Sequence, residues 1–155
     1  MSIKSVKENL IKIAPDLEII EHDISTASVN EAALAHNVDP GQIVKTIALI
    51  LEEPILIMVA GNTKIDNKKY KNIFKKKAKM LSASDTELYT SHPIGGVCPF
   101  GLPSNLVIYA DKSLENYEFV IPAAGSAKSS VIISRKRLIN MVSAIIVDVT
   151  KKIIQ

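Results

Sequence analysis

The amino-acid sequence predicts a single mixed α/β domain, α+β-like, built on a mixed and largely antiparallel sheet. The chain has 155 residues, of which 47% are hydrophobic and 23% charged, and this suits one globular domain with a sizeable core. Short runs rich in β-branched residues alternate with capped amphipathic segments. Several connections are as short as hairpin turns, which favours antiparallel pairing over a doubly wound parallel sheet. No internal repeat or linker divides the sequence, so we expect one domain over residues 1–155.

The N-terminal part predicts two helices around a short strand. Apolar residues recur on one helical stripe, at Ile3, Val6, Leu10 and Ile13. A strand over 17–21 follows, and Ser28 and Glu31 have the spacing of a capping box that opens a helix through Ala35. Asp39-Pro40 marks another helix start, because proline suits the first helical position.

The next segment predicts a β-hairpin followed by a lysine-rich helix. Two apolar runs, 43–51 and 55–60, are separated by the turn signal Glu52-Glu53-Pro54. Asp66 is placed to cap a helix that turns its lysines outward. The residues expected to face inward on this helix are Tyr70, Ile73 and Phe74.

The rest of the chain predicts mostly strands. Residues 79–81 have the composition of a strand, and Ser84 and Glu87 have the spacing of another capping box. Ser134 is expected to cap a helix that ends near Val142. Further strands are expected over 106–110, 119–123, 131–133 and 144–149.

A loop rich in glycine and proline over 91–101 is the first candidate for a functional site. It reads Ser-His-Pro-Ile-Gly-Gly-Val-Cys-Pro-Phe-Gly and so holds three of the six glycines and two of the seven prolines. Glycine permits close backbone approach and positive φ, whereas proline fixes φ and removes a donor. Such a rigid loop can present backbone amides and carbonyls to a ligand. A second small-residue loop, Gly125-Ser126-Ala127, could form a backbone nest or a plain turn.

Lys45 is the second candidate, because it interrupts an apolar strand. Alternation places it on the same face as Ile43, Ile47 and Leu49. An ammonium group there carries a desolvation cost unless a ligand or partner compensates it. The pattern leaves two interpretations open, a functional lysine at the edge of a pocket and a lysine whose stem lies on the sheet while its amine reaches solvent.

Seven lysines without an intervening acid fall within residues 68–79, although the net charge of the chain is only +3. This density permits contacts to phosphate groups. The same run also suits the solvated face of an ordinary helix, and the run alone favours that interpretation.

Several classes of chemistry have no support in the sequence. Neither a dinucleotide-binding fingerprint nor a P-loop is present, and the histidines and Cys98 lack the spacing of metal ligands, so we expect neither a cofactor nor a metal. Cys98 and His92 could form a thiol and base pair. No group is evident that would orient the histidine, which favours an inert cysteine.

The composition also predicts the compartment. One cysteine cannot form an internal disulfide, which suits a reducing cytoplasm. The N-terminus is charged and unlike a secretory signal. The longest apolar runs, such as 55–60, are too short to cross a bilayer as helices, so we expect no membrane partner.

Three separated motifs together resemble the YbaK/EbsC family of aminoacyl-tRNA trans-editing domains. They are Val44-Lys45-Thr46, the segment from His92 to Gly101, and Ala123-Ala124-Gly125-Ser126. Gly61-Asn62 and Ile65-Asp66-Asn67 extend the resemblance over nearly the whole chain. Lys128 departs from it, because relatives often carry a small polar residue at this position of the loop.

The resemblance implies both a fold and an activity. The implied fold is a YbaK-like mixed sheet or partly closed barrel surrounded by helices, related to the editing insertion of prolyl-tRNA synthetases. The implied activity is hydrolysis, in trans, of the ester in tRNA for proline that carries a wrong small amino acid such as cysteine or alanine. Neither metal nor cofactor is implied. A synthetase or an elongation factor would assist the weakly charged protein, and DNA would not be a partner.

The resemblance and the motifs also assign roles to residues. Lys45 is expected to be catalytic and to stabilise charge on the ester, while a backbone carbonyl near Gly101, or the substrate's own hydroxyl, orients the attacking water. The tRNA itself is expected to contact Lys68, Lys71 and Lys75. The residues expected to bind the acyl group and the terminal adenosine are Thr46, His92, Pro93, Ile94, Gly95, Gly96, Val97, Pro99, Phe100, Gly125 and Ser126.

A second hypothesis of a different class is a catalytically silent module that binds an amino acid, an aminoacyl-adenylate or uncharged tRNA for regulation. The lysine and the glycine-rich loop favour the enzyme. Loss of ester during incubation with misacylated tRNA distinguishes the two.

Overall fold

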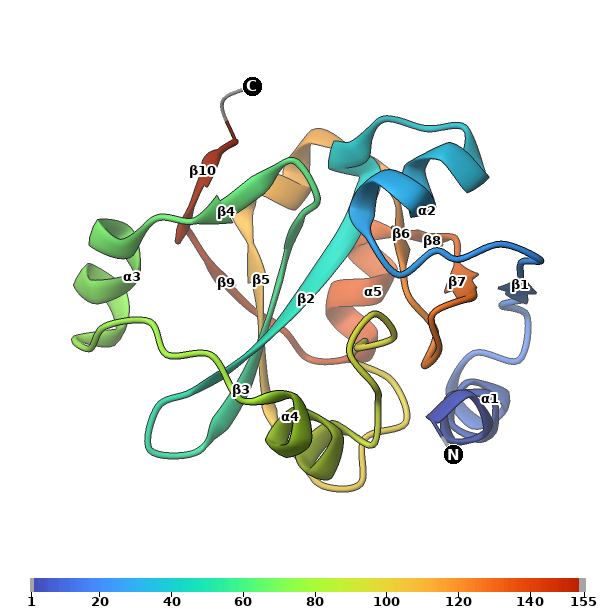
Figure 1. The fold of residues 1–155 in the computed structure, drawn as a ribbon, viewed down its shortest axis with the longest axis horizontal. Helices are drawn as coiled ribbons and strands as arrows, with labels where there is room; N and C mark the ends of the chain where they lie inside the picture. The colour runs from blue at the N-terminus through green and yellow to red at the C-terminus, as the bar shows by residue number, and fades with distance from the viewer. Residues whose placement is uncertain (1, 154–155) are drawn as a thin grey trace.

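The computed structural model describes residues 2–153, which fold into one α+β domain (Figure 1). None of the helices in this range is long and apolar enough to cross a membrane. The α-helices are α1 (Ser2–Ile13), α2 (Val29–His36), α3 (Asn67–Phe74), α4 (Ala83–Thr90) and α5 (Arg135–Met141). Two short 3-10 helices are η1 (Pro40–Gln42) and η2 (Lys112–Asn116).

Over the same residues the strands form one six-stranded mixed sheet and two short antiparallel ribbons. The main sheet has the order β8-β6-β2-β3-β5-β9, and the ribbons are β1-β7 and β10-β4. Two of the five neighbouring pairs in the main sheet are antiparallel and three are parallel, so the sheet is mixed as expected but has fewer antiparallel pairs than predicted; both ribbons are antiparallel. The strands are β1 (Ile19–Glu21), β2 (Ile43–Ile50), β3 (Pro54–Ala60), β4 (Thr63–Ile65), β5 (Val107–Asp111), β6 (Phe119–Pro122), β7 (Ser129–Val131), β8 (Ile133–Ser134), β9 (Ile145–Val147) and β10 (Thr150–Lys152).

The β2–β3 hairpin forms the centre of the main sheet and confirms the hairpin prediction. Its antiparallel register runs from Val44 opposite Ala60 to Ile50 opposite Pro54. Every residue of β3 is buried, because the sheet is covered on both faces at this strand. β5 lies parallel to β3 and β6 pairs in parallel with the first two residues of β2.

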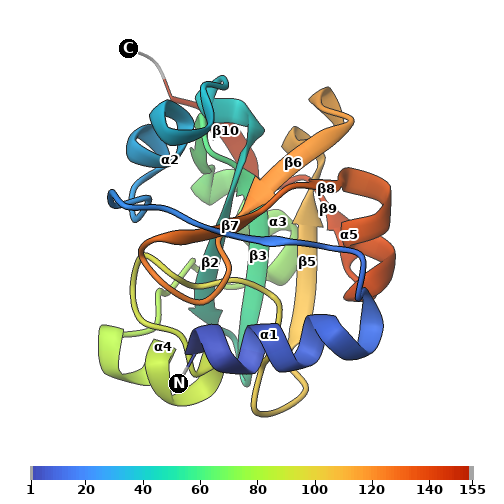
Figure 2. The ribbon, with the colours of Figure 1, turned by 90° about the vertical axis from the view of Figure 1, so that its right-hand side faces the viewer.

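The larger apolar cluster packs one face of the sheet against α1, α5 and the glycine-rich loop. Val6 and Leu10 from α1, Leu138 from α5, and Phe100 from the loop are all essentially inaccessible to solvent. Figure 2 shows the β1-β7 ribbon crossing this side above α1. The long N-terminal helix and its apolar stripe therefore serve to close the core.

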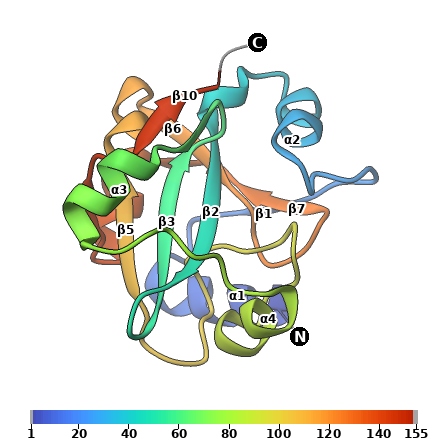
Figure 3. The ribbon, with the colours of Figure 1, turned by 60° about the vertical axis from the view of Figure 1, so that its left-hand side comes forward.

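The opposite face of the hairpin packs against α3. Tyr70 is buried under this helix, and its ring lies 4.6 Å from that of Phe74. Phe74 in turn meets Tyr109 of β5 edge to face at 5.0 Å. Figure 3 shows α3 next to β5. Ile47 and Leu49 of β2 belong to the same cluster, so alternation along β2 puts Lys45 on the α3 face as predicted.

Several local predictions were wrong. The cap of α4 is Ser82, whose side chain accepts from the Asp85 amide, and not Ser84. Ile73 is 44% exposed and does not face inward. The segment 79–81 forms only an isolated bridge, between Met80 and Leu49. The β4–β10 ribbon was not expected, because each of its strands has only three residues and three of the six are exposed lysines.

One edge of β2 has an unpaired stretch. β6 pairs only with Ile43 and Val44, and the segment 79–81 lies at the far end, where the Leu81 amide donates to the Ala48 carbonyl. Among residues 2–153, no strand pairs with this edge over 45–47. The backbone of β2 is thus unpaired at Lys45 on the edge away from β3.

Candidate active site

Lys45 is partly buried, and its amine is held by a backbone carbonyl. The Lys45 Nζ donates to the Thr63 carbonyl oxygen at 2.6 Å. Burial lowers the pKa of Lys45 below its ordinary value of 10.5, since desolvation disfavours the charged form. An ammonium has three donors, and Thr63 is the one acceptor found for it within residues 2–153. The amine is therefore positioned and retains donors for a ligand.

A cleft of about 270 Å³ opens beside Lys45 at the unpaired edge of β2. Its lining contains no carboxylate, imidazole or thiol, so Lys45 is the one ionisable side chain among the lining residues. The walls are otherwise small or aliphatic. The lining residues are Thr26, Ala27, Ser28, Val29, Ala32, Ile43, Val44, Lys45, Thr46, Ile94, Gly95, Val97, Ile121, Ala123 and Ser130.

The glycine-rich loop supplies one wall of this cleft mainly through Gly95. Its φ of 91° is one that residues with a side chain rarely adopt, and a Cβ at this position would lie 2.9 Å from the Cβ of Ala27 on the facing wall. Ile94 and Val97 of the same loop also line the cleft. Backbone and short side chains thus define the width of the cleft here.

The two predicted loops meet through their glycines. The Gly125 amide donates to the Gly96 carbonyl at 3.1 Å. A Cβ on Gly96 would lie 2.7 Å from the Ser126 amide nitrogen, so only glycine fits between the loops. Gly96, Gly125 and Ser126 support the cleft and do not line it.

Other residues of the 91–101 loop that were predicted to bind the substrate do not line the cleft. His92 and Phe100 are fully buried, and the His92 Nε2 lies 2.7 Å from the Phe100 carbonyl oxygen. Cys98 lies under the same loop, with its Sγ 3.5 Å from His92 Nε2, and burial raises the pKa of its thiol to about 12. Pro93 and Pro99 are absent from the cleft lining as well. These residues hold the loop in shape.

Gly101 is not brought to Lys45. Its amide donates to the Asn9 side chain at 3.0 Å, and its φ of 62° places it against the backbone of Ser5 on α1. It lines a different cleft, together with Asn9 and Ile13. This glycine therefore anchors the end of the loop on the first helix.

Thr46 lines the cleft directly after the lysine. Its Oγ1 is buried, and no hydrogen-bond partner is found for it within the described part of the chain. An unpaired buried hydroxyl is costly, so a polar group of a ligand in the cleft would stabilise it.

A second cleft, of about 340 Å³, also has Lys45 in its lining. Pro40, Gly61, Asn62 and Ile153 contribute to its walls. Gly61 is closely packed there, since a Cβ would lie 2.4 Å from the Pro40 carbonyl oxygen. Lys45 therefore lines both clefts.

The helix α2 contributes walls that the sequence did not assign to the site. Ser28 caps this helix in a complete capping box with Glu31, as predicted, and Ser28 and Val29 line both clefts. Ser130, buried on β7, completes the first cleft. The capping box located the start of the helix, but nothing in the sequence indicated that this end faces Lys45.

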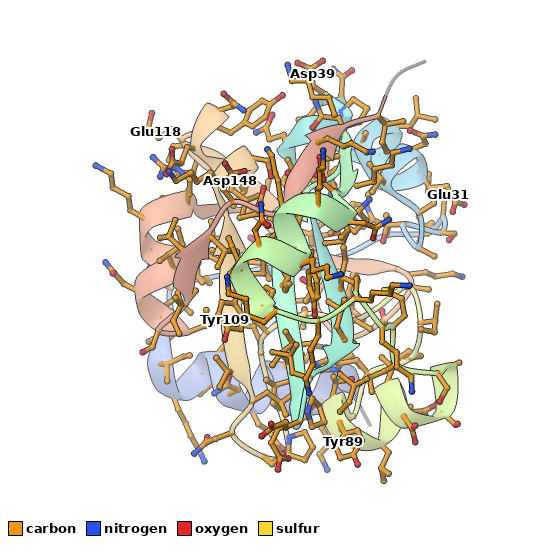
Figure 4. The ribbon with its side chains drawn as sticks, turned by 90° about the vertical axis from the view of Figure 1, so that its left-hand side faces the viewer. Glu31, Asp39, Tyr89, Tyr109, Glu118 and Asp148 are labelled. Carbon is orange, nitrogen blue, oxygen red and sulfur yellow. The ribbon has the colours of Figure 1, made fainter. Side chains whose placement is uncertain are left out.

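The lysines proposed to contact tRNA lie on α3. Lys68, Lys71 and Lys75 are exposed, with Lys68 in the first turn and Lys75 at the C-cap. Lys69 already has partners within the domain, because its Nζ binds Asp148 at 3.1 Å and the Thr150 carbonyl at 2.8 Å. Figure 4 shows Asp148 beside this helix. The three exposed lysines are outside both clefts that Lys45 lines.

Comparison with known proteins gives consistent results. Residues 23–141 match the family model of the aminoacyl-tRNA editing domain. The chain is 39% identical over 140 residues to the uncharacterized protein YwhH of Bacillus subtilis (strain 168), and the match covers 89% of each. It is 29% identical over 122 residues to the proline–tRNA ligase of Streptococcus suis (strain 05ZYH33), spanning 77% of this chain but only 18% of the ligase.

A solved structure described as a "putative trans-editing enzyme for prolyl tRNA synthetase" superposes with a TM-score of 0.90. The two sequences are 27% identical, and the match covers 97% of each chain. Sequence and structure agree on the same domain. The chain belongs to the aminoacyl-tRNA editing domain family.

Proposed function

We propose that residues 1–155 form one deacylase domain that hydrolyses mischarged tRNA in trans. Its first candidate substrate is tRNA for proline that carries cysteine or alanine. The observation that carries the proposal is the Lys45 ammonium, fixed by Thr63 at the edge of a 270 Å³ cleft without acidic residues in its walls. The family match and the relation to proline–tRNA ligases support the same reaction.

Lys45 would act on the ester carbonyl. Water attacks the carbonyl carbon, and the negative charge that develops on the carbonyl oxygen is stabilised by the ammonium. The ester bond to the terminal ribose then breaks, the ribose oxygen takes a proton, and the free amino acid leaves. The low dielectric of a partly buried site strengthens this charge stabilisation.

The attacking water would be positioned by the substrate. The lining of the cleft offers no side-chain general base. The free hydroxyl of the terminal ribose, next to the ester, can orient the water by a hydrogen bond and take its proton while it passes its own proton to the leaving ribose oxygen. Gly101 lies in a different cleft, so we do not assign its carbonyl to this step.

Selection would depend on size and on one polar contact. A methylene in an apolar pocket discriminates by only about 1–3 kcal/mol, so the rigid wall at Gly95 must exclude larger groups by steric clash. Ile94 and Val97 would contact the acyl side chain, and the Thr46 hydroxyl would bind its polar atoms. The second cleft would hold the terminal adenosine, because it shares Lys45 with the first cleft and so adjoins the position proposed for the ester.

The proposed tRNA contacts remain Lys68, Lys71 and Lys75 of α3. With a net charge of +3, the domain would bind RNA weakly. Assistance by prolyl-tRNA synthetase or an elongation factor is part of this proposal.

The test is ester loss from a panel of misacylated tRNAs. Tritiated alanyl-, cysteinyl- and prolyl-tRNA for proline are incubated with the protein, and acid-precipitable label is followed. We expect rapid loss from the alanyl or cysteinyl species and little loss from the prolyl species. A protein that shifts the RNA in a gel without consuming any ester would instead be a binding module.

A further inference from the structure

We propose that the β4–β10 ribbon binds the phosphates of the unpaired 3′ end of the tRNA through Lys64 and Lys151. The choice of RNA as the ligand rests on the proposed function. These two lysines are distinct from the α3 lysines proposed above to contact tRNA, and the ribbon was not indicated by the sequence. Figure 1 shows β4 and β10 side by side, next to the start of β2.

Two lysines face each other across this ribbon. The antiparallel register places Lys64 directly opposite Lys151, and both side chains are exposed. Directly opposed residues of an antiparallel pair project from the same face, where like charges destabilise the ribbon. Lys152, the next residue, is exposed as well. An anionic ligand would turn this repulsion into a favourable contact.

The carboxylates near the ribbon are already engaged. Asp148 binds Lys69, and Asp66 accepts from the Lys68 and Lys69 amides as the cap of α3. Lys151 and Lys69 exert a secondary attraction that lowers the pKa of Asp66, after those hydrogen bonds. Within residues 2–153, no ion pair forms at Lys64 or Lys151. Both amines are available to an external anion.

Hydrogen bonds hold the backbone of the ribbon, so the two lysines start from fixed positions on it before RNA arrives. Asp111 is buried and accepts hydrogen bonds from the Val149 amide at 2.7 Å and from the Thr150 hydroxyl at 2.7 Å. The Lys69 amine binds the Thr150 carbonyl from the other side. Preorganised charges lose less conformational entropy on binding.

The ribbon continues directly into the proposed catalytic site. Lys152 pairs with Thr63, whose carbonyl holds the Lys45 amine. The Ile153 amide donates to the Asn62 carbonyl at 3.0 Å, and Asn62 and Ile153 line the second cleft with Lys45. The phosphates that precede a terminal nucleoside bound in that cleft would therefore lie next to the ribbon.

The experiment compares two charge-neutralised variants by fluorescence anisotropy with uncharged tRNA for proline over a range of salt concentrations. K64Q/K151Q removes the ribbon pair. K12Q/K136Q removes the same charge from exposed positions on α1 and α5, away from the ribbon. Thermal unfolding of both variants checks folding, and K64Q/K151Q should melt close to the wild type, because relief of the repulsion between the two lysines offsets the lost attraction between Lys151 and Asp66.

We expect K64Q/K151Q to bind several-fold more weakly than the wild type. The slope of log K against log salt should become shallower by about 1.4, because each single-strand phosphate that a lysine neutralises contributes about 0.7. K12Q/K136Q should match the wild type. On a tRNA whose unpaired 3′ end has been removed, K64Q/K151Q and the wild type should bind alike.

Three results would overturn the inference. The first is that K64Q/K151Q binds tRNA as tightly as the wild type, and the second is that K12Q/K136Q loses as much affinity as K64Q/K151Q. The third is that K64Q/K151Q loses as much affinity for the trimmed tRNA as for the full-length tRNA. Because binding is measured on uncharged tRNA, the result is independent of ester hydrolysis. A wild-type protein that shows the ribbon effect but hydrolyses none of the misacylated tRNAs would refute the proposed function and leave the ribbon assignment standing.

Discussion

Gly96 and Gly125 join the two loops of the site backbone to backbone. The Gly125 amide donates to the Gly96 carbonyl at 3.1 Å, and a Cβ on Gly96 would lie 2.9 Å from the Gly125 carbonyl carbon. The loop that walls the cleft is therefore held by the loop at 124–126. Neither glycine lines the cleft itself.

Gly96→Ala should separate these loops. The new methyl group meets backbone atoms, which cannot move aside as a flexible side chain would, so we expect a loss of about 1–3 kcal/mol in the free energy of unfolding. A widened cleft should also raise KM for misacylated tRNA. Urea denaturation and deacylation kinetics measure both effects. Ile94→Ala, at a 64% exposed position, is the control for stability. Equal stability of Gly96→Ala and the wild type would contradict the account of the loop contact.

Cys98→Ala should retain deacylation. The thiol is buried and its pKa is raised to about 12, so very little thiolate is present at pH 8. Iodoacetamide should therefore label Cys98 slowly in the native protein at pH 8 and rapidly in urea, as measured by mass spectrometry. Loss of activity in a folded Cys98→Ala variant, or inactivation by alkylation of the native protein, would show that the thiol takes part in the reaction.

The His22–His36 contact should make the stability of the domain depend on pH. The two Nε2 atoms lie 3.2 Å apart and connect α2 to the segment after β1. Burial, and then the neighbouring His22, lower the pKa of His36 below its ordinary 6.5. The unfolded chain thus binds protons more readily, and stability present above about pH 6.5 is lost as the pH falls through the folded pKa.

His36→Gln should reduce this pH dependence. Urea midpoints at pH 7.5 and 5.5 should differ less in the variant than in the wild type. Some dependence should persist, because burial also lowers the pKa of His92. If the urea midpoint fell by the same amount between pH 7.5 and 5.5 in both proteins, the His22–His36 contact would not be the source of the pH dependence.

The sequence predicted those parts of the fold and site that rest on local signals. The apolar runs around Glu52-Glu53-Pro54 located the β2–β3 hairpin, and alternation placed Lys45 on the face of Ile47 and Leu49. The glycines of the 91–101 loop indicated close backbone approach, which Gly96 makes to the second loop.

The sequence could not predict the features that arise where segments far apart in the chain come into contact. The walls that α2 and Ser130 add to the cleft come from elements far apart in the chain. The same holds for Gly101, whose contacts are with α1 and not with Lys45. β4 and β10 have three residues each and acquire their structure only by pairing across more than eighty residues. Short polar strands of this kind leave no periodic pattern.

Replacing Lys45 should change the stability of the domain little, although it should reduce the activity strongly. Lys45→Met keeps the length of the side chain but removes a desolvated charge, while the Thr63 carbonyl loses its donor. Because these effects oppose each other, the free energy of unfolding should change by less than about 1 kcal/mol. A large loss in urea denaturation would indicate that Lys45 is a structural residue.

The most direct measurement is single-turnover deacylation of alanyl- and cysteinyl-tRNA for proline by the wild type, Lys45→Met and Lys45→Ala. Removing one group that stabilises an oxyanion costs about 10²–10³-fold in rate, so both variants should be slowed at least that much while remaining folded. Lys12→Ala, at an exposed position on α1, should react like the wild type. Near-normal hydrolysis by the folded Lys45 variants would contradict the proposed role of this amine.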